Sequence, residues 1–224
     1  MDKLPKITND FKKYIEEKAK IGNYSIKFGE LKILVFPYVF PPKSVFSQSS
    51  QTLIKSFGNL SGQTVLDLGT GTGIQALCAA KAGATKVIAS DIEKNALNCA
   101  RKNIKINKLQ DIIEVIESDL FEKIPKVGFD LIIANLPIID FNEPNPKFHS
   151  LSDPNYRLHI NLFQNAAKYL NRNGKIRLIH ANLEGNKAFK KLENLASNNA
   201  YIYDILEESR ALGYIWRNYC FKLK

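Results

Sequence analysis

The chain has 224 residues and carries a formal net charge of +10 at pH 7, from 32 Lys and Arg against 22 Asp and Glu. Hydrophobic residues make up 45% and charged residues 24%, which is typical of a globular protein and excludes a disordered or collagen-like chain. No apolar run is long enough to cross a bilayer, and the N-terminus lacks a signal-peptide pattern, so we expect a cytoplasmic location. The 3 cysteines form no C-x-x-C pair, which disfavours disulfides and predicts no metal site.

Residues 1–46 predict an appendage, which we interpret as a lid on the domain formed by residues 47–224. A short helix and two extended segments, around Ile26 and Leu31, are expected in it. The helix presents one face formed by Phe11, Tyr14, Ile15 and Lys18.

Beyond residue 60, short β-branched runs alternate with longer amphipathic stretches, which indicates βαβ units around a parallel sheet with helices on both faces. The expected strands are Thr64–Asp67, Lys86–Ser90, Ile112–Glu117, Phe129–Ala134 and Lys175–His180. The expected helices are Ile74–Ala82, Glu93–Ile106, Asn155–Leu170 and Glu184–Ser197, with Asp153 as N-cap and Pro154 at the first position of the third.

The last two strand-like segments, Tyr201–Leu206 and Ile215–Leu223, leave no room for a crossover helix. They are therefore expected to pair antiparallel around Gly213. The fold class predicted is a Rossmann-like, seven-stranded, mostly parallel α/β sheet that ends in a reversed hairpin.

A glycine-rich loop, Gly69-Thr-Gly71-Thr-Gly73, follows the first of these strands and leads into a helix. Glycines at such spacing allow the backbone to approach a ligand closely. The G-x-G-x-x-A frame from Gly71, with Asp91 twenty residues on, also fits a dinucleotide. We expect Asp67, at the mouth of the loop, to repel a pyrophosphate and to attract a cationic cofactor.

These residues resemble those of the class I S-adenosylmethionine-dependent methyltransferases, and the resemblance covers residues 45–224. It implies that Asp67 lies near the methionine end of the cofactor, that Asp91 binds the ribose hydroxyls and that Ile92 walls the adenine. It further implies that Asp119, beside Leu120, faces the adenine amine, although Ser118-Asp119 alone is also compatible with a simple turn. The cofactor-binding residues expected are Asp67, Gly69, Thr70, Gly71, Gly73, Asp91, Ile92, Asp119, Leu120 and Asn135.

The segment Asn135-Leu136-Pro137-Ile138, at the end of a strand, is similar to the (N/D)-P-P-(Y/F) motif of methyltransferases that modify planar nitrogens. A planar nitrogen is a poor nucleophile, so it must be oriented. The Asn135 side-chain oxygen and the Leu136 carbonyl are expected to accept its two N–H groups, and Pro137 to stiffen the turn. A strand-end asparagine in an ordinary turn is the alternative interpretation of Asn135.

Ile138 replaces the aromatic residue of that motif, and we expect Phe141, Phe148 or Tyr156 to substitute for it. Residues 139–153 form a long loop, which together with the appendage is expected to shape the acceptor pocket. His180 is interpreted as a structural residue rather than a pocket residue, and the aromatics between Tyr201 and Tyr219 as sheet packing.

Within the superfamily, Val45-Phe46-Ser47, the Asn-x-Pro turn and the final strand resemble the methyltransferase small domain, which includes ribosomal-RNA guanine and protein glutamine methylases. The resemblance implies N-methylation of RNA or of a translation-related protein, and the net charge favours RNA slightly. The alternatives are a small-molecule methyltransferase, a cofactor-binding module without catalysis and an NAD-dependent oxidoreductase.

Overall fold

The computed structural model describes residues 6–44 and 46–224, so Met1–Pro5 and Val45 of the Val45-Phe46-Ser47 motif lie outside the described residues. Its elements in chain order are α1 (Lys6–Lys20), β1 (Tyr24–Phe28), β2 (Leu31–Val35), α2 (Gln48–Lys55), β3 (Thr64–Leu68), α3 (Ile74–Lys81), β4 (Lys86–Asp91), α4 (Lys94–Ile106), β5 (Ile113–Glu117), β6 (Phe129–Ala134), α5 (Arg157–Asn165), β7 (Leu170–Ala181), α6 (Lys187–Asn198), β8 (Tyr201–Ala211) and β9 (Tyr214–Leu223). No helix among the described residues is long and apolar enough to cross a membrane.

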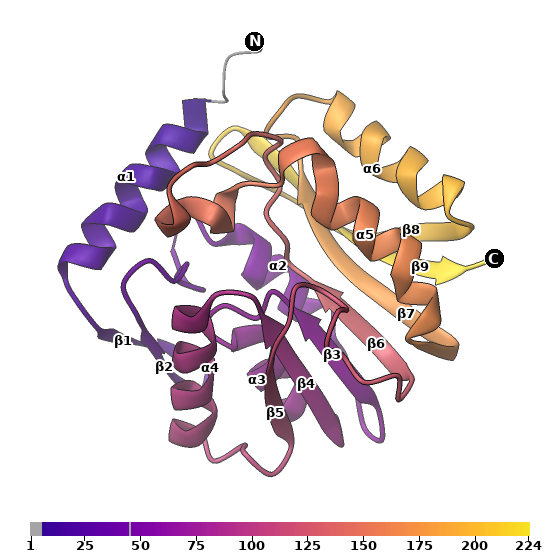
Figure 1. Ribbon diagram of the computed structural model, residues 1–224, viewed down its shortest axis with the longest axis horizontal. Coiled ribbons are helices and arrows are strands. Elements are labelled where there is room, and N and C mark those ends of the chain that lie inside the picture. The colour runs from indigo at the N-terminus through magenta and orange to yellow at the C-terminus, as the bar shows by residue number, and fades with distance from the viewer. Residues whose placement is uncertain (1–5, 45) are drawn as a thin grey trace.

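Seven strands form one sheet in the order β5-β4-β3-β6-β7-β9-β8 (Figure 1). The pairs from β5 to β7 are parallel, whereas β9 runs antiparallel to both β7 and β8. This confirms the predicted mostly parallel sheet with a reversed C-terminal hairpin. The chain leaves β3 toward β4 on one side and returns to β6 on the other, so a topological switch point lies between β3 and β6.

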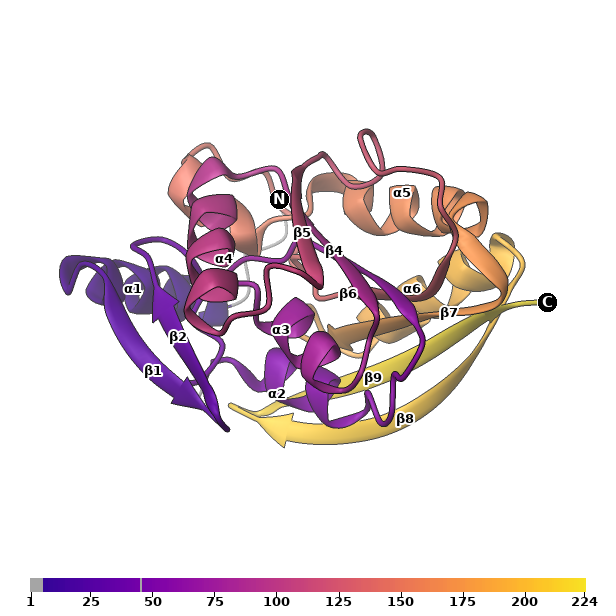
Figure 2. The same cartoon turned by 90° about the horizontal axis from the view of Figure 1, so that it is seen from below.

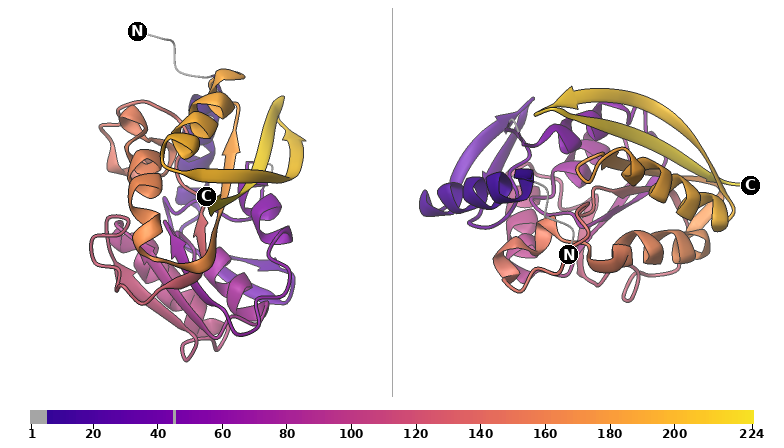
Figure 3. Two further views of the ribbon diagram at one scale, coloured as in Figure 1. Left: turned by 90° about the vertical axis from the view of Figure 1, so that its right-hand side faces the viewer. Right: turned by 90° about the horizontal axis from the view of Figure 1, so that it is seen from above.

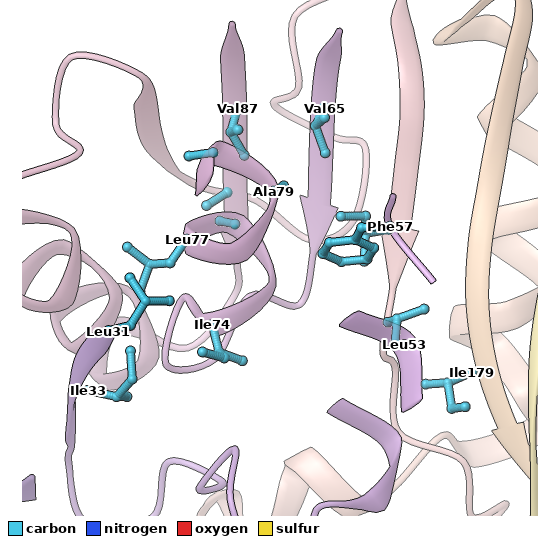
Figure 4. Close-up of a cluster of buried hydrophobic side chains, with 14 of the residues drawn as sticks. Leu31, Ile33, Leu53, Phe57, Val65, Ile74, Leu77, Ala79, Val87 and Ile179 are labelled. Atoms are coloured by element: carbon cyan, nitrogen blue, oxygen red, sulfur yellow. The ribbon is translucent and has the colours of Figure 1, made fainter. Parts of the chain in front are cut away.

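Side chains alternate along the central strands because successive residues of a strand point to opposite faces. Val65, Val87 and Leu131 belong to one apolar cluster, together with residues of α2, α3 and α4, and Figure 4 shows part of this cluster. Leu66 and Ile132 belong to the other cluster, together with residues of α5 and α6. Both faces of these central strands are therefore covered, which leaves the ends of the strands for a site.

The predicted helix Asn155–Leu170 is too long at both ends. Asn155 and Tyr156 have φ values of 55° and 60°, which interrupt the helix before Arg157, and β7 already begins at Leu170. Pro154 opens a short 3₁₀ turn instead of the helix. The N-cap of α5 is Tyr156 and not the predicted Asp153, although the Asp153 carboxylate accepts the Leu158 N–H in the first turn over 2.7 Å.

The reversed hairpin is longer than predicted. β8 continues through Ala211 and turns at Leu212-Gly213, where both residues have positive φ, as a tight hairpin turn requires. The hairpin forms one curved edge of the molecule (Figure 3).

The N-terminal segment packs against the α/β body rather than standing apart from it. β1 and β2 pair antiparallel, as the two extended segments suggested, and lie beside α4 (Figure 2). Asn103 of α4 donates to the Leu34 carbonyl over 2.8 Å and accepts the Leu34 N–H over 2.7 Å. Ile7, Phe11 and Ile15 of α1 are buried in the same cluster as α2 and α3. The segment thereby reaches the carboxyl end of the sheet.

Candidate cofactor and acceptor site

A cavity of about 680 Å³ opens at the carboxyl ends of β3, β4, β5 and β6, beside the switch point. This is where open α/β sheets bind ligands, and the volume falls within the range usual for small-molecule sites. The glycine loop, Asp91, Asp119 and Asn135 all line this cavity, although they come from four different strand ends. The structure therefore brings most of the residues expected from the sequence to one place.

The three glycines of the loop serve different purposes. A Cβ on Gly71 would meet no protein atom within 4 Å, so the space beside this glycine is available to a ligand. A Cβ on Gly73 would lie 3.3 Å from Ala100, so this glycine is required by packing against α4. A Cβ on Gly69 would lie 3.5 Å from the Leu136 side chain, and φ is positive at all three positions. Close ligand approach thus explains Gly71 but not Gly73.

Asp67 lies beneath the glycine loop and not at its mouth. It is 1% exposed and does not line the cavity. Its Oδ2 accepts the Thr70 hydroxyl over 2.6 Å and the Ala76 N–H over 3.1 Å, which fixes the loop to the start of α3. Burial raises the pKa of Asp67 to about 7, against the lowering effect of those two hydrogen bonds. The structure thus places Asp67 where it supports the loop, which corrects the expected position at the mouth.

Asp91 ends β4 and lines the cavity, with its carboxylate held from both sides. Gly71 N–H donates to Oδ2 over 2.9 Å and Glu93 N–H donates to Oδ1 over 3.0 Å. Burial raises the pKa of this carboxyl, partly offset by the two backbone donors. The neighbouring Ile92 is 55% exposed on the cavity wall. An oriented carboxylate beside an exposed apolar side chain suits a ribose with its base.

Asp119 and Leu120 follow β5 and line the same wall. The Asp119 carboxylate forms a two-pronged ion pair with Arg157 at the start of α5, with N–O distances of 2.9 and 3.3 Å. The Ser118 hydroxyl donates to the Leu120 carbonyl over 2.8 Å, so this segment is also a turn. The turn interpretation of Ser118-Asp119 is thus confirmed, and the placement of Asp119 at the adenine amine stays a prediction. Arg157 carried no sequence signal beyond its charge.

Asn135 is the first residue after β6, and Leu136, Pro137 and Ile138 continue along the cavity wall. The Asn135 Nδ2 donates to the Ser50 hydroxyl on α2 over 3.1 Å. Neither the Asn135 Oδ1 nor the Leu136 carbonyl accepts a hydrogen bond from the residues that the structure describes. These two oxygens are therefore available as a pair of acceptors.

The aromatic residues on the cavity wall are not those expected from the sequence. Phe141, Phe148 and Tyr156 do not line the cavity. The loop over residues 139–153 contains a 3₁₀ helix, Pro146–Leu151, which buries Phe148 against the core. Aromatic residues of the N-terminal segment and of β9 line the cavity instead: Phe11, Tyr38, Phe40, Phe46 and Trp216. Their distance from the Asn135 motif in the sequence did not indicate that they would lie beside it.

Charged side chains along the cavity are mainly acidic. Among the described residues that line it, the acidic ones are Asp91, Glu93, Asp119 and Glu143, and the basic ones are Lys147 and Arg157. Asp119 is paired with Arg157 and Glu143 with Lys12, so the carboxylates of Asp91 and Glu93 exceed the remaining cation, Lys147. This small excess favours a positively charged ligand over a diphosphate. Asp91 and Glu93, and not Asp67, thus provide the negative charge that faces the cavity.

His180 lies outside the cavity. It is fully buried, its Nε2 is 2.9 Å from the Tyr156 hydroxyl, and burial lowers its pKa well below the usual value. The structural interpretation of His180 is confirmed, and a role in lining the pocket is excluded.

The sheet order, the glycine loop and the acidic strand ends together define the fold and site of a class I methyltransferase. Comparison with known proteins agrees: residues 30–204 match the methyltransferase small domain family. The chain belongs to this family, and S-adenosylmethionine is accordingly the cofactor. The alternative of an NAD-dependent oxidoreductase on the Gly71 frame was wrong.

Individual relatives support the same assignment. A putative protein N5-glutamine methyltransferase of Methanocaldococcus jannaschii is 29% identical over 169 residues, which cover 72% of this chain and 82% of that protein. A bifunctional methyltransferase of Rickettsia typhi is 34% identical over 159 residues, and the match spans 64% of this chain but only 30% of that protein. The crystal structure of a ribosomal protein L11 methylase from Lactobacillus delbrueckii subsp. bulgaricus has a TM-score of 0.61 at 22% identity and covers 90% of this chain and 99% of that one.

Proposed function

We propose that this enzyme transfers a methyl group to a planar amino or amide nitrogen held by Asn135 and Leu136. The observation that carries the proposal is the pair of available oxygens, the Asn135 Oδ1 and the Leu136 carbonyl, at the end of β6 on the cavity wall. Two acceptors on adjacent residues of the cavity wall match in number the two N–H groups of one NH₂. Pro137 restricts the backbone that follows and so stiffens the pair.

Orientation is the main catalytic contribution of these residues. With both N–H groups bound, the nitrogen lone pair is directed away from the two oxygens and toward the donor, and its conjugation is weakened. The cofactor, when bound, supplies a sulfonium-activated methyl group. Because such a methyl group is displaced readily, the site needs no strong general base, and the nitrogen releases its proton to water after transfer.

The cofactor-binding roles divide along the cavity. Asp91 would accept the ribose hydroxyls, with Ile92 against the base and Asp119 and Leu120 at its far edge. Gly71 would allow the backbone to approach, while Thr70 and Asp67 keep the loop in shape. Asp67 supports the methionine end indirectly through the loop, since it does not reach the cavity itself.

The N-terminal segment acts in this proposal as the lid that completes the acceptor pocket. Phe11 and Phe46 pack edge to face with ring centroids 5.2 Å apart, and both line the cavity. Lys12 of α1 pairs with Glu143 in the loop 139–153 and lies over the rings of Phe141 and Phe148. The lid and the loop therefore form one packed unit, and Phe46 takes the place of the aromatic that Ile138 lacks.

Of the two candidate acceptor polymers, RNA and protein, we favour RNA because of the net charge of +10. The cavity wall itself is acidic, so phosphates must be bound elsewhere. Arg101, Lys105 and Lys108 line a groove toward the far end of α4. The 13-residue helix is about 20 Å long and begins at the cavity, so the groove along its second half lies within a distance that a folded RNA covers. A protein glutamine is the second candidate, because the relative from M. jannaschii carries that activity in its name.

Labelled methyl transfer into cell extract distinguishes the two polymers. We expect radioactivity on nitrogen, in material that nuclease degrades and protease does not. Binding to that RNA should weaken steeply with added salt, with a slope reduced by Lys105→Glu. Label that survives nuclease but is lost with protease would show that the acceptor is a protein and not RNA. Label on carbon or oxygen would refute the proposed methylation of nitrogen.

A further inference from the structure

The hydrogen bond between Asn135 and α2 points to a residue that the family motif does not contain. Ser50 is the third residue of α2 and lies 85 positions before Asn135 in the chain. Its hydroxyl oxygen is 3.1 Å from the Asn135 Nδ2 and 3.3 Å from the Gln75 Nε2. Ser50 is 5% exposed and Gln75 is 3% exposed, and both line the cavity. Two amide groups thus converge on one buried hydroxyl.

We propose that Ser50 is a positioning residue that holds the Asn135 amide in the orientation needed to accept the substrate N–H. This inference rests on the proposed function of Asn135. The terminal torsion of asparagine has two nearly equivalent settings, which exchange Oδ1 and Nδ2. With Nδ2 bound to Ser50, Oδ1 is left for the acceptor. In the opposite setting, an NH₂ group would face the substrate NH₂ group, and two donors cannot bind each other.

Gln75 bonds to the same Ser50 hydroxyl oxygen as Asn135 does. The serine oxygen therefore serves two amide donors at once, the Gln75 Nε2 and the Asn135 Nδ2. Gln75 itself is the second residue of α3, directly after the glycine loop. The acceptor side of the site is thereby connected to the cofactor loop through two buried hydrogen bonds.

The position of Ser50 is fixed by contacts outside the cavity. The neighbouring Thr52 bonds through its hydroxyl to Ser209 of β8 over 3.0 Å, and its carbonyl accepts the Asn218 side chain over 3.3 Å. Leu53 is fully buried beneath the helix. The reversed hairpin therefore anchors α2, and a hydroxyl on a rigid helix can define the setting of a side chain on the sheet.

The test is Ser50→Ala in the full chain, with steady-state kinetics, cofactor titration and thermal melting. We expect kcat to fall at least 10-fold while the cofactor Kd stays within 2-fold of wild type, and Ser50→Thr to restore most of the rate. Ser56→Ala, which removes a hydroxyl from the other end of α2 and does not touch the cavity, serves as the control. If Ser50→Ala does not fold, Ser50→Cys, a weak acceptor, is expected to show the same loss of kcat.

A double-mutant cycle separates positioning from a general structural role. If Ser50 acts through Asn135, Ser50→Ala causes no further loss in the Asn135→Ala background. Wild-type turnover in Ser50→Ala, or an equal loss of rate in both backgrounds, would overturn the inference. Failure of the proposed function looks different, since there Asn135→Ala alone would turn over normally.

Discussion

The Thr70 hydroxyl and the Asp67 carboxylate are joined by a 2.6 Å hydrogen bond beneath the glycine loop, in a place closed to solvent. The same Asp67 oxygen accepts the Ala76 N–H. The Asp67 side chain thus connects β3 to Thr70 in the glycine loop and to Ala76 in the first turn of α3. These bonds explain why a side-chain oxygen that accepts hydrogen bonds is needed here even though it does not reach the ligand.

This burial makes the stability of the cofactor-free protein depend on pH. The folded pKa of Asp67, about 7, lies above its usual value of 3.8, so between these pH values the folded state binds a proton that the unfolded state has lost. The contribution of Asp67 to the free energy of unfolding is fully present below pH 3.8 and is lost as pH rises through about 7. The free energy of unfolding should fall by roughly 2 to 3 kcal/mol between pH 5 and 8 on account of Asp67.

Asp67→Asn should remove that part of the pH dependence, because asparagine does not titrate. The fold should be kept, because the single asparagine side-chain oxygen can accept both hydrogen bonds. Urea unfolding of the two proteins at pH 5 and pH 8 measures it. The variant should gain stability relative to wild type at the higher pH. Parallel losses in both proteins would show that the Asp67 proton is not released in this range.

Asp91→Ala should weaken cofactor binding at least 10-fold, because the carboxylate is held toward the cavity by Gly71 and Glu93 and is the expected partner of two ribose hydroxyls. Isothermal titration with S-adenosylmethionine provides the measurement. Glu117→Ala is a matched control, because Glu117 pairs with Asp91 in the sheet register but does not line the cavity. Equal affinities for the Asp91 variant and wild type would contradict the ribose role.

Phe46→Ala should raise the KM for the acceptor by roughly 5-fold or more and leave cofactor affinity unchanged, since stacking on an aromatic ring contributes about 1 to 3 kcal/mol per base. Phe46→Tyr should behave like wild type. Tyr203→Ala removes an aromatic ring of β8 that does not line the cavity and should not change the KM. An unaltered KM in Phe46→Ala would leave the acceptor without the proposed aromatic contact.

The sequence predicted the sheet and much of the site because both depend on local patterns. Short apolar strands, the glycines and the polar strand ends are each contained within a few residues, and parallel topology brings those ends together. The aromatic wall could not be predicted, because Phe11 and Phe46 reach the cavity through tertiary packing of a segment far from the motif. The place of Asp67 was wrong for a related reason: a loop acid can turn toward the ligand or beneath the loop, and only its partners, Thr70 and Ala76, determine which. Ser50 carried no signal at all in a run of polar residues.

The central claim is that Asn135 orients a nitrogen for methylation while the cofactor is bound elsewhere in the cavity. Single-turnover methyl transfer by Asn135→Ala, measured beside its S-adenosylmethionine affinity, tests it most directly. The account predicts a rate lowered at least about 100-fold with the dissociation constant unchanged. A variant that binds the cofactor and transfers methyl groups at the wild-type rate would contradict it.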